Sequence, residues 1–249
     1  MSGHSKWAQI KRQKGAADAR RGQLFTKLSR EIVVAARHGG ANPEFNARLR
    51  LAVQKARDSN MPAEGIERAL KRGAGEGEGT TFSEAVYEGY GAGGAAILVE
   101  VLTDNRNRTT AEVRNAFSRG NGTLGESGCV KWLFEPRGVI TVESEDTEEV
   151  ALLVIDAGAE DVKIDDGSLE VYTRPEGLEE VRQALEDREV SPSSADVLMV
   201  PSTTVMLDER EALQTLRLLD RLEELDDVQR VFTNADFPQE ALEKYRSAG

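Results

Sequence analysis

The stretch GVITVESEDTEEVALLVIDAGAEDVKIDDGSLEVYT, residues 138–173, carries the pattern that decides the fold. Apolar residues alternate in its first part and then follow helical spacing, and two short apolar runs flank the hairpin signal Asp166-Gly167. A further helix and strand complete the order strand–helix–strand–strand–helix–strand, which is ferredoxin-like. The predicted elements are strands at 138–143, 162–164, 169–173 and 195–200, a helix at about 147–157, and a helix carrying Leu178, Val181 and Leu185.

The sequence on each side of this unit predicts strand–helix–strand. Before it come strands at 95–101 and 130–135, around a helix that Thr109 and Glu112 cap. After it come strands at 203–207 and 228–233, around a helix that starts at Asp208, and then a terminal helix at 238–246. The two flanks together predict a second ferredoxin-like unit, into which the first is inserted.

The N-terminal third predicts a small helical bundle. Its helices are expected at 23–38, from Asn42-Pro43 onward, and from Pro62 to Gly73. The second helix has the apolar stripe Phe45, Leu49, Val53 and Ala56, which we expect to face inward.

These elements predict an α+β multidomain protein, with a three-helix N-terminal domain and two ferredoxin-like α/β domains, one inserted into the other. The expected parts are a flexible basic arm at 1–22, a basic helical domain at 23–75, a split domain at 82–135 with 202–249, and an inserted domain at 136–201. The glycine-rich run GAGEGEGTT (73–81) is a linker by composition.

Charge divides the chain more sharply than its net value of −12 suggests. Residues 1–72 hold 16 Lys and Arg against 6 Asp and Glu, whereas residues 73–249 hold 16 against 38. Such asymmetry favours binding of a polyanion by the basic part. We therefore expect a nucleic acid, either promoter DNA or ribosomal RNA, to bind Lys6, Trp7, Lys11, Arg12, Lys14, Arg20, Arg21, Lys27, Arg30, Arg48, Arg50, Lys55, Arg57, Arg68, Lys71 and Arg72.

The motif TDNRNRT (103–109) lies between a predicted strand and the start of a helix. Backbone N–H groups there favour an anion, and Arg106 and Arg108 could add to such a site or contact a partner. The alternative is a local network, in which Asp104 and Asn105 hold the turn and the arginines pair with nearby acids.

No pattern in the chain indicates catalysis, a cofactor or a metal. YEGYGAGG (87–94) has glycine spacing that resembles a dinucleotide fingerprint, but it precedes a strand and not a helix. The two histidines and one cysteine show no zinc spacing, and no Ser-His-acid set is evident. Helices two and three have the rough length of a helix-turn-helix, which is a weak signal.

The sequence resembles the YebC/PmpR family along essentially its whole length. The resemblance rests on MSGHSKW (1–7), FTKLSREI (25–32), AARHGGANP (35–43), NARLRLAV (46–53), NMP (60–62), YEGYGAGG, TDNRNRT and the LGESG loop. It implies an all-helical first domain followed by two α/β domains, one of which interrupts the other. It also implies that residues 1–22 are a working arm, which weakens the alternative of a mitochondrial transit peptide.

The family comprises probable bacterial transcriptional regulators and includes a mitochondrial translational activator of a cytochrome oxidase subunit. The resemblance therefore implies a non-enzymatic, DNA-binding regulator of transcription. The alternative is a ribosome-associated factor that helps translation through difficult sequences. The chain is expected in the cytoplasm, away from membranes, and its acidic domains are expected to contact a protein partner. The sequence does not indicate an oligomeric state.

Overall fold

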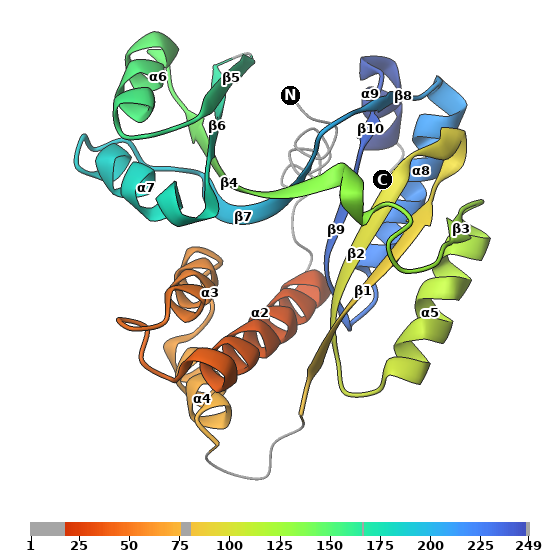
Figure 1. Ribbon diagram of the computed structural model, residues 1–249, viewed down its shortest axis with the longest axis horizontal. Coiled ribbons are helices and arrows are strands. Elements are labelled where there is room, and N and C mark those ends of the chain that lie inside the picture. The colour runs from red at the N-terminus through yellow and green to blue at the C-terminus, as the bar shows by residue number, and fades with distance from the viewer. Residues whose placement is uncertain (1–17, 76–80, 166, 248–249) are drawn as a thin grey trace.

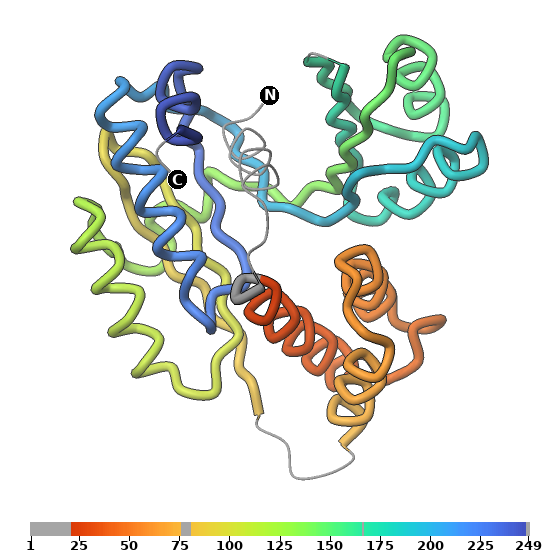
Figure 2. The backbone as a smooth tube through the Cα atoms, turned by 180° about the vertical axis from the view of Figure 1, so that it is seen from behind, coloured from red at the N-terminus to blue at the C-terminus, as the bar shows by residue number. Residues whose placement is uncertain are grey.

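The computed structural model describes residues 18–75, 81–165 and 167–247. It has the expected α+β architecture of a helical unit and two four-stranded antiparallel sheets. The helical unit consists of α2 (Asp18–Gly39), α3 (Ala47–Asp58) and α4 (Ala63–Gly73). Helix α2 packs against both others, and its first turns lie beside the turn between α8 and β9 in both views of the chain (Figures 1 and 2).

The predicted ferredoxin-like insertion is confirmed. Its sheet has the order β5-β6-β4-β7, in which the first and third strands along the chain occupy the centre. Helices α6 and α7 cover one face and enclose a core that includes Ile140, Val154 and Leu185. The elements of this inserted unit are β4 (Phe134–Glu143), α6 (Thr147–Asp156), β5 (Asp161–Asp165), β6 (Ser168–Thr173), η3 (Pro175–Gly177), α7 (Leu178–Glu186) and β7 (Ser194–Pro201).

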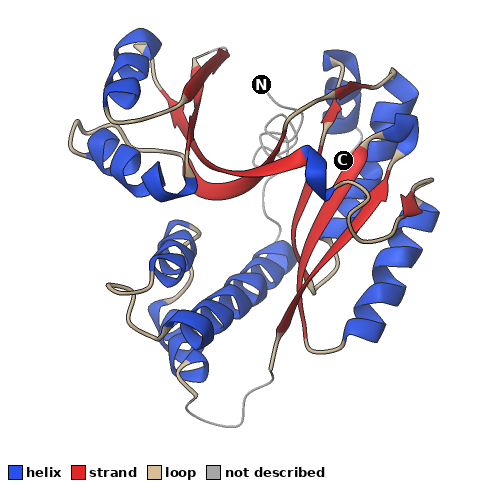
Figure 3. Cartoon of the chain, in the orientation of Figure 1, coloured by secondary structure: helices blue, strands red, loops and turns tan. Residues whose placement is uncertain are grey.

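The other sheet has the order β3-β1-β2-β9, so it combines strands from both sides of the insertion. Helices α5 and α8 pack together on it, and Figure 3 shows the long paired strands of the inserted unit, β4 and β7, extending toward this outer sheet. The elements of this outer unit are β1 (Ser83–Tyr90), η1 (Ala92–Gly94), β2 (Ala96–Thr103), α5 (Arg106–Arg119), β3 (Thr123–Leu124), η2 (Lys131–Leu133), β8 (Val205–Met206), α8 (Glu209–Glu223), β9 (Val228–Thr233), β10 (Ala235–Asp236) and α9 (Gln239–Ser247).

The strands of the outer sheet differ from those predicted. No strand was predicted at YEGYGAGG, but this segment supplies the end of β1, which pairs antiparallel with β2 along its full length. Gly89 permits this packing, since an added Cβ would lie 2.7 Å from the Phe117 ring and 2.5 Å from the Thr123 carbonyl oxygen. The expected strand at 203–207 is reduced to β8, which pairs with β10 in a separate two-stranded sheet.

The predicted strand at 130–135 is also wrong. Residues Lys131–Leu133 form a 3-10 turn, and the strand β4 begins only at Phe134. The buried carboxylate of Glu88 accepts hydrogen bonds from the backbone N–H groups of Gly128, Val130 and Lys131. These donors are therefore unavailable to a sheet, because each N–H group is already paired.

The second helix starts four residues later than predicted. Asn46 is its N-cap and accepts a hydrogen bond from the Leu49 N–H, whereas Asn42 accepts one from the Glu44 N–H within a turn. Phe45 consequently precedes the helix. Its side chain is 86% exposed, so the expectation that it faces inward is wrong.

Candidate nucleic-acid interface

The structure divides the predicted binding residues into those that contact other units and those that face outward. Five of them, Lys6, Trp7, Lys11, Arg12 and Lys14, lie outside the described residues. Arg20 and Arg21 belong to the first turn of α2, and the Arg21 side chain is exposed.

Lys27 and Arg30, one turn apart on α2, contact the turn that joins α8 to β9. The Lys27 ammonium donates to the Glu223 carbonyl oxygen at 2.5 Å. The Arg30 guanidinium donates to the Asp226 carbonyl oxygen at 2.6 Å and to the Asp227 carboxylate at 2.9 Å, and it lies 5.3 Å from the centre of the Phe82 ring. Both cations therefore fasten the helical unit to the outer unit.

Lys55 of α3 takes part in a charge cluster that joins all three units. Its ammonium lies 2.7 Å from the Asp196 carboxylate on β7. Arg230 on β9 contacts Glu31 of α2 at 2.9 Å and the same Asp196 at 3.1 Å, and it also donates to the Val197 carbonyl oxygen. We call Glu31, Lys55, Asp196 and Arg230 the three-unit cluster.

The cluster shifts the ionisation of its members and of a neighbour. Burial opposes the charge of Asp196, but Arg230 and Lys55 outweigh it and lower the pKa of its carboxyl group. Burial likewise opposes the charge of Arg230, whose pKa is nevertheless raised by Asp196 and Glu31. Glu100 on β2 has a raised pKa, because its burial outweighs the attraction of Arg230. The cluster is thus mutually compensated, and Lys55 is held within it.

Two further predicted residues contact groups within the molecule. The Arg48 guanidinium lies 2.5 Å from the Glu84 carboxylate, and both side chains are about half exposed. The Arg50 guanidinium donates to the carbonyl oxygens of Pro43 and Glu44, at 3.2 and 3.3 Å. Arg48 thus adds to the contact with the outer unit, whereas Arg50 braces the loop before its own helix.

The remaining predicted cations form an outward-facing set on the end of α3 and on α4. Each is exposed, and within the described part of the chain none has a hydrogen bond or ion pair. Helix α4 lies at the edge of the molecule away from both sheets (Figure 1). Glu64 and Glu67 also lie on this helix, so its surface carries charges of both signs. The charged residues of its last turn, Lys71 and Arg72, are both basic. We call Arg57, Arg68, Lys71 and Arg72 the open cations.

A shallow hollow of about 370 Å³ lies between α2 and the start of α4, and one open cation, Arg68, lines it. Phe25, Ser29, Met61 and Pro62 also contribute to its lining. The turn before α4 is fixed by Asn60 in the left-handed region, with φ of 56°, and by a hydrogen bond from the Met61 N–H to the Ala56 carbonyl oxygen. These contacts fix the turn from which α4 begins.

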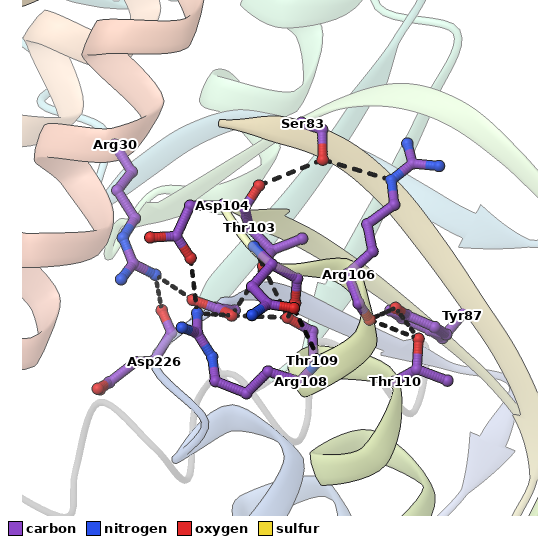
Figure 4. Close-up of polar contacts among 12 residues, drawn as sticks. Arg30, Ser83, Tyr87, Thr103, Asp104, Arg106, Arg108, Thr109, Thr110 and Asp226 are labelled. Carbon is purple, nitrogen blue, oxygen red and sulfur yellow. Dashed lines mark hydrogen bonds and ion pairs between the residues drawn. The ribbon is translucent and has the colours of Figure 1, made fainter. Parts of the chain in front are cut away.

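The TDNRNRT motif forms a polar network, in which Thr103, Arg108 and Thr109 lie close together (Figure 4), and the carboxylate that they share is that of Asp227. The hydroxyl groups of Thr103 and Thr109 donate to the Asp227 carboxylate at 3.0 and 2.6 Å, and the Arg108 guanidinium contacts it at 2.7 Å. Arg108 also pairs with Asp104, while Arg106 donates to the Glu84 carbonyl oxygen and to Ser83.

The anion that this motif contacts is a group of the protein itself, the carboxylate of Asp227. Burial opposes the charge of Asp227, but hydrogen bonds from Thr109, Arg108 and Thr103 lower its pKa. The start of α5 is also capped, because the Asn105 side chain accepts the Arg108 N–H. Of the two alternatives open from the sequence, the local network is the arrangement that the structure contains.

The acidic residues that pair with Arg30, Lys55 and Arg230 were not predicted from the sequence. Asp227 and Asp196 lie in none of the motifs quoted above, and Glu31 lies in FTKLSREI without a partner close to it in the sequence. The pairs Arg30–Asp227, Lys55–Asp196 and Arg230–Glu31 each join residues that are more than 100 positions apart in the chain. One signal was available. Arg230 interrupts the apolar run VQRVFT, and a charged residue in the middle of such a strand indicates a buried partner.

The described residues contain neither a cluster of metal-ligating side chains nor a helix suited to crossing a membrane. No group of three or more His, Cys, Asp or Glu side chains there is arranged to hold a metal ion. Among the helices of the described ranges, none combines the length and apolar composition needed to cross a membrane.

Comparison with known proteins places both parts of the chain in one family. Residues 5–76 match the model of the TACO1/YebC protein N-terminal domain, and residues 82–235 match that of the TACO1/YebC second and third domain. A probable transcriptional regulatory protein of Dehalococcoides mccartyi is 61% identical, with 99% of each chain covered. Another protein of that description, from Moorella thermoacetica, is 55% identical over 98% of this chain and 99% of its own.

A solved structure supports the same assignment. The crystal structure of a conserved hypothetical protein from Aquifex aeolicus superimposes with a TM-score of 0.82 at 51% sequence identity. The match covers 89% of this chain and 93% of the other. At this identity, the likeness extends to sequence as well as fold.

Proposed function

This chain belongs to the TACO1/YebC family, and from that premise we propose that it regulates transcription by binding DNA through the open cations of α3 and α4. It acts by binding and not by catalysis, in the cytoplasm. The names of its relatives support a role in transcription. We choose the open cations as the binding surface because the other predicted cations of the described residues mostly contact oxygen atoms of the protein itself.

The two groups of cations differ in whether other units of the protein already supply their partners. Lys27, Arg30, Arg48 and Lys55 all contact oxygen atoms of the outer or inserted unit. A phosphate would have to displace those oxygens, whereas it can approach the open cations directly. Screening at physiological salt, with a Debye length of about 8 Å, lets the open cations act independently of the distant acidic units.

The salt dependence of duplex binding tests the surface. Fluorescence anisotropy with a labelled 20-base-pair duplex, measured between 50 and 300 mM KCl, gives the slope of log K against log salt. If Arg57, Arg68, Lys71 and Arg72 each neutralise one phosphate, replacing all four by Ala should reduce the slope by about 3 to 4.

A matched control separates a surface effect from a change of net charge. Replacing Arg114, Arg119, Arg188 and Arg217 by Ala removes four exposed cations from the other units. This control should keep the wild-type slope. The proposal fails if the control flattens the slope as much as the test variant does, or if the test variant keeps the wild-type slope.

Sedimentation with purified ribosomes decides between the two roles considered from the sequence. Under the proposal, the protein stays at the top of a sucrose gradient and binds promoter fragments selectively in vitro. Co-migration with ribosomes that the four-Ala variant loses would replace transcription by translation as the function, with the same surface bound to ribosomal RNA.

Exposed apolar residues of the inserted unit also support the proposal that this unit binds a protein partner. It exposes Leu152 and Ile155 of α6 and Ile164 of β5, by 67, 53 and 50%. Acidic residues surround them in the sequence, so a complementary partner surface would be apolar and basic. Replacing Leu152 and Ile155 by Ser should leave duplex binding unchanged, because these residues lie outside the open cations.

A further inference from the structure

Phe45, which stands before the first turn of α3, is the most exposed large hydrophobic side chain among the described residues. A residue in this position usually packs against the residue in the fifth position after it, one turn into the helix. That residue is Arg50, whose guanidinium is directed to the carbonyl oxygens of Pro43 and Glu44, and Phe45 remains 86% exposed. The ring is therefore largely uncovered by the rest of the helical unit.

The loop that carries Phe45 is fixed by hydrogen bonds. The buried Asn46 amide donates to the carbonyl oxygens of Ala35 and Gly40, both at 2.8 Å. The Asn42 side chain accepts the Glu44 N–H at 2.9 Å. Together with the two Arg50 hydrogen bonds, these contacts fix the backbone that carries the ring, so a ligand would bind it without first ordering the loop.

The loop projects away from both sheets on the outer side of the helical unit (Figures 1 and 2). Its charged neighbours are mixed. Arg50 is cationic, whereas Glu44 belongs to the loop, and Glu179 of α7 is close enough for Arg50 to contribute to lowering its pKa, after the larger effect of Arg182. The carboxylates disfavour a phosphate on the ring itself. A flat, uncharged group is not repelled by them.

We propose that Phe45 is a stacking platform for an unpaired nucleobase of the nucleic acid that the open cations bind. This inference rests on the proposed function and adds a preference for single-stranded or bulged sites to it. Every base has an aromatic face, so stacking on Phe45 needs no particular sequence. In an intact duplex the bases are already stacked on one another, and the platform has no ligand there.

The comparison of strands and duplex tests this proposal. Affinities for a 20-nucleotide single strand and for the 20-base-pair duplex are measured at one salt concentration, for wild type and for Phe45→Ala, Phe45→Leu and Phe45→Trp. Loss of one stacked base corresponds to roughly 5- to 150-fold in affinity. Phe45→Ala and Phe45→Leu should both lose at least fivefold on the single strand and nothing on the duplex, whereas Phe45→Trp should retain wild-type affinity.

Two controls make the result specific. Leu152→Ala, which shortens an exposed side chain of the inserted unit, should change neither affinity. Urea unfolding of each Phe45 variant should match wild type, since the side chain makes little contact in the folded protein. A bulged duplex with 2-aminopurine as the unpaired base should lose fluorescence on binding wild type, and should lose much less on binding Phe45→Ala.

Failure of the platform and failure of the proposed function give different results. If Phe45→Ala binds the single strand as wild type does, while the duplex slope still depends on the open cations, only the platform is wrong. If Phe45→Leu keeps wild-type affinity, the contact is merely apolar and stacking is overturned. If wild type binds neither strand nor duplex, both inferences fall together.

Discussion

The Arg230 guanidinium on β9 lies 3.1 Å from the Asp196 carboxylate on β7, so an ion pair joins the two four-stranded sheets. Glu31 and Lys55 of the helical unit complete the cluster from the other side. Each unit therefore contributes at least one charge that pairs with a charge of another unit. We expect the three-unit cluster to set the relative position of the three units. The orientation of the open cations depends on that position.

Replacing Asp196 by Asn should destabilise the folded protein by about 2 kcal/mol, because Lys55 and Arg230 each lose a charge-assisted hydrogen bond or ion pair in a place that water hydrates poorly. The midpoint of urea unfolding measures this effect. Proteolysis under native conditions should also become faster between the units.

The matched control for Asp196 is Arg174→Met, which breaks the exposed ion pair between Arg174 and Glu160. Exposed pairs contribute little to stability, so this midpoint should not move. Equal midpoints for wild type and Asp196→Asn would show that the cluster does not hold the units together.

Replacing Asp227 by Asn should loosen both α2 and the start of α5. The carboxylate is 2% exposed and is contacted by Thr103, Thr109, Arg108 and Arg30. An Asn side chain keeps one acceptor but adds an N–H donor facing hydroxyl groups and guanidinium groups. We expect a loss of about 2 kcal/mol and faster amide hydrogen exchange in residues 105–109. Unchanged exchange there would contradict the network.

Stability should depend on pH through Glu88. Burial opposes its charge, but backbone N–H groups of Gly128, Val130 and Lys131 lower its pKa below the ordinary value of 4.5. A lowered folded-state pKa stabilises the fold above the ordinary value, and this contribution disappears as the pH falls through the lowered pKa. Glu88→Gln should therefore be less stable than wild type at pH 7, by about 2 kcal/mol, and the difference should shrink below pH 4.5.

The fluorescence of Trp132 reports on the same loop, because its indole N–H donates to the Cys129 carbonyl oxygen. Trp7 is the other tryptophan of the chain, so Trp7→Phe isolates the signal. In that background, Glu88→Gln should change the Trp132 emission at pH 7. A stability difference that stays constant from pH 7 to pH 3.5 would show that the Glu88 charge is not what holds the loop.

Asn46 should be the most sensitive polar residue of the helical unit. It caps α3 through the Leu49 N–H and donates to the carbonyl oxygens of Ala35 and Gly40. Loss of a cap costs about 1 kcal/mol and each unsatisfied buried acceptor adds to that. Asn46→Ala should lose about 3 kcal/mol in urea unfolding.

The Asn46→Asp variant separates the two roles of this side chain. It keeps the acceptor for the Leu49 N–H, but it places a carboxylate next to two carbonyl oxygens. If capping alone matters, Asn46→Asp should be as stable as wild type. If the two donated hydrogen bonds matter, as we expect, it should be destabilised as well.

Local chemistry made much of the fold predictable. The order of the inserted unit follows from strand and helix periodicities that need no partner outside it, and its sheet order is confirmed. The errors lie where distant residues override local pattern. The carboxylate of Glu88 prevents a strand at 130–133, and contact with β2 draws Ser83–Tyr90 into a sheet despite its single glycine, Gly89.

The sequence by itself determined the separation of charge, the three N-terminal helices and the presence of one α/β unit within another, because composition and periodicity are properties of neighbouring residues. Only the tertiary structure decided which cations remain available. Arg30 and Asp227, or Lys55 and Asp196, are more than 100 residues apart in the chain, and a Lys that meets a carboxylate has the same local pattern as one that meets water. The exposure of Phe45 was decided in the same way, by the Asn46 side chain that fixes where α3 begins.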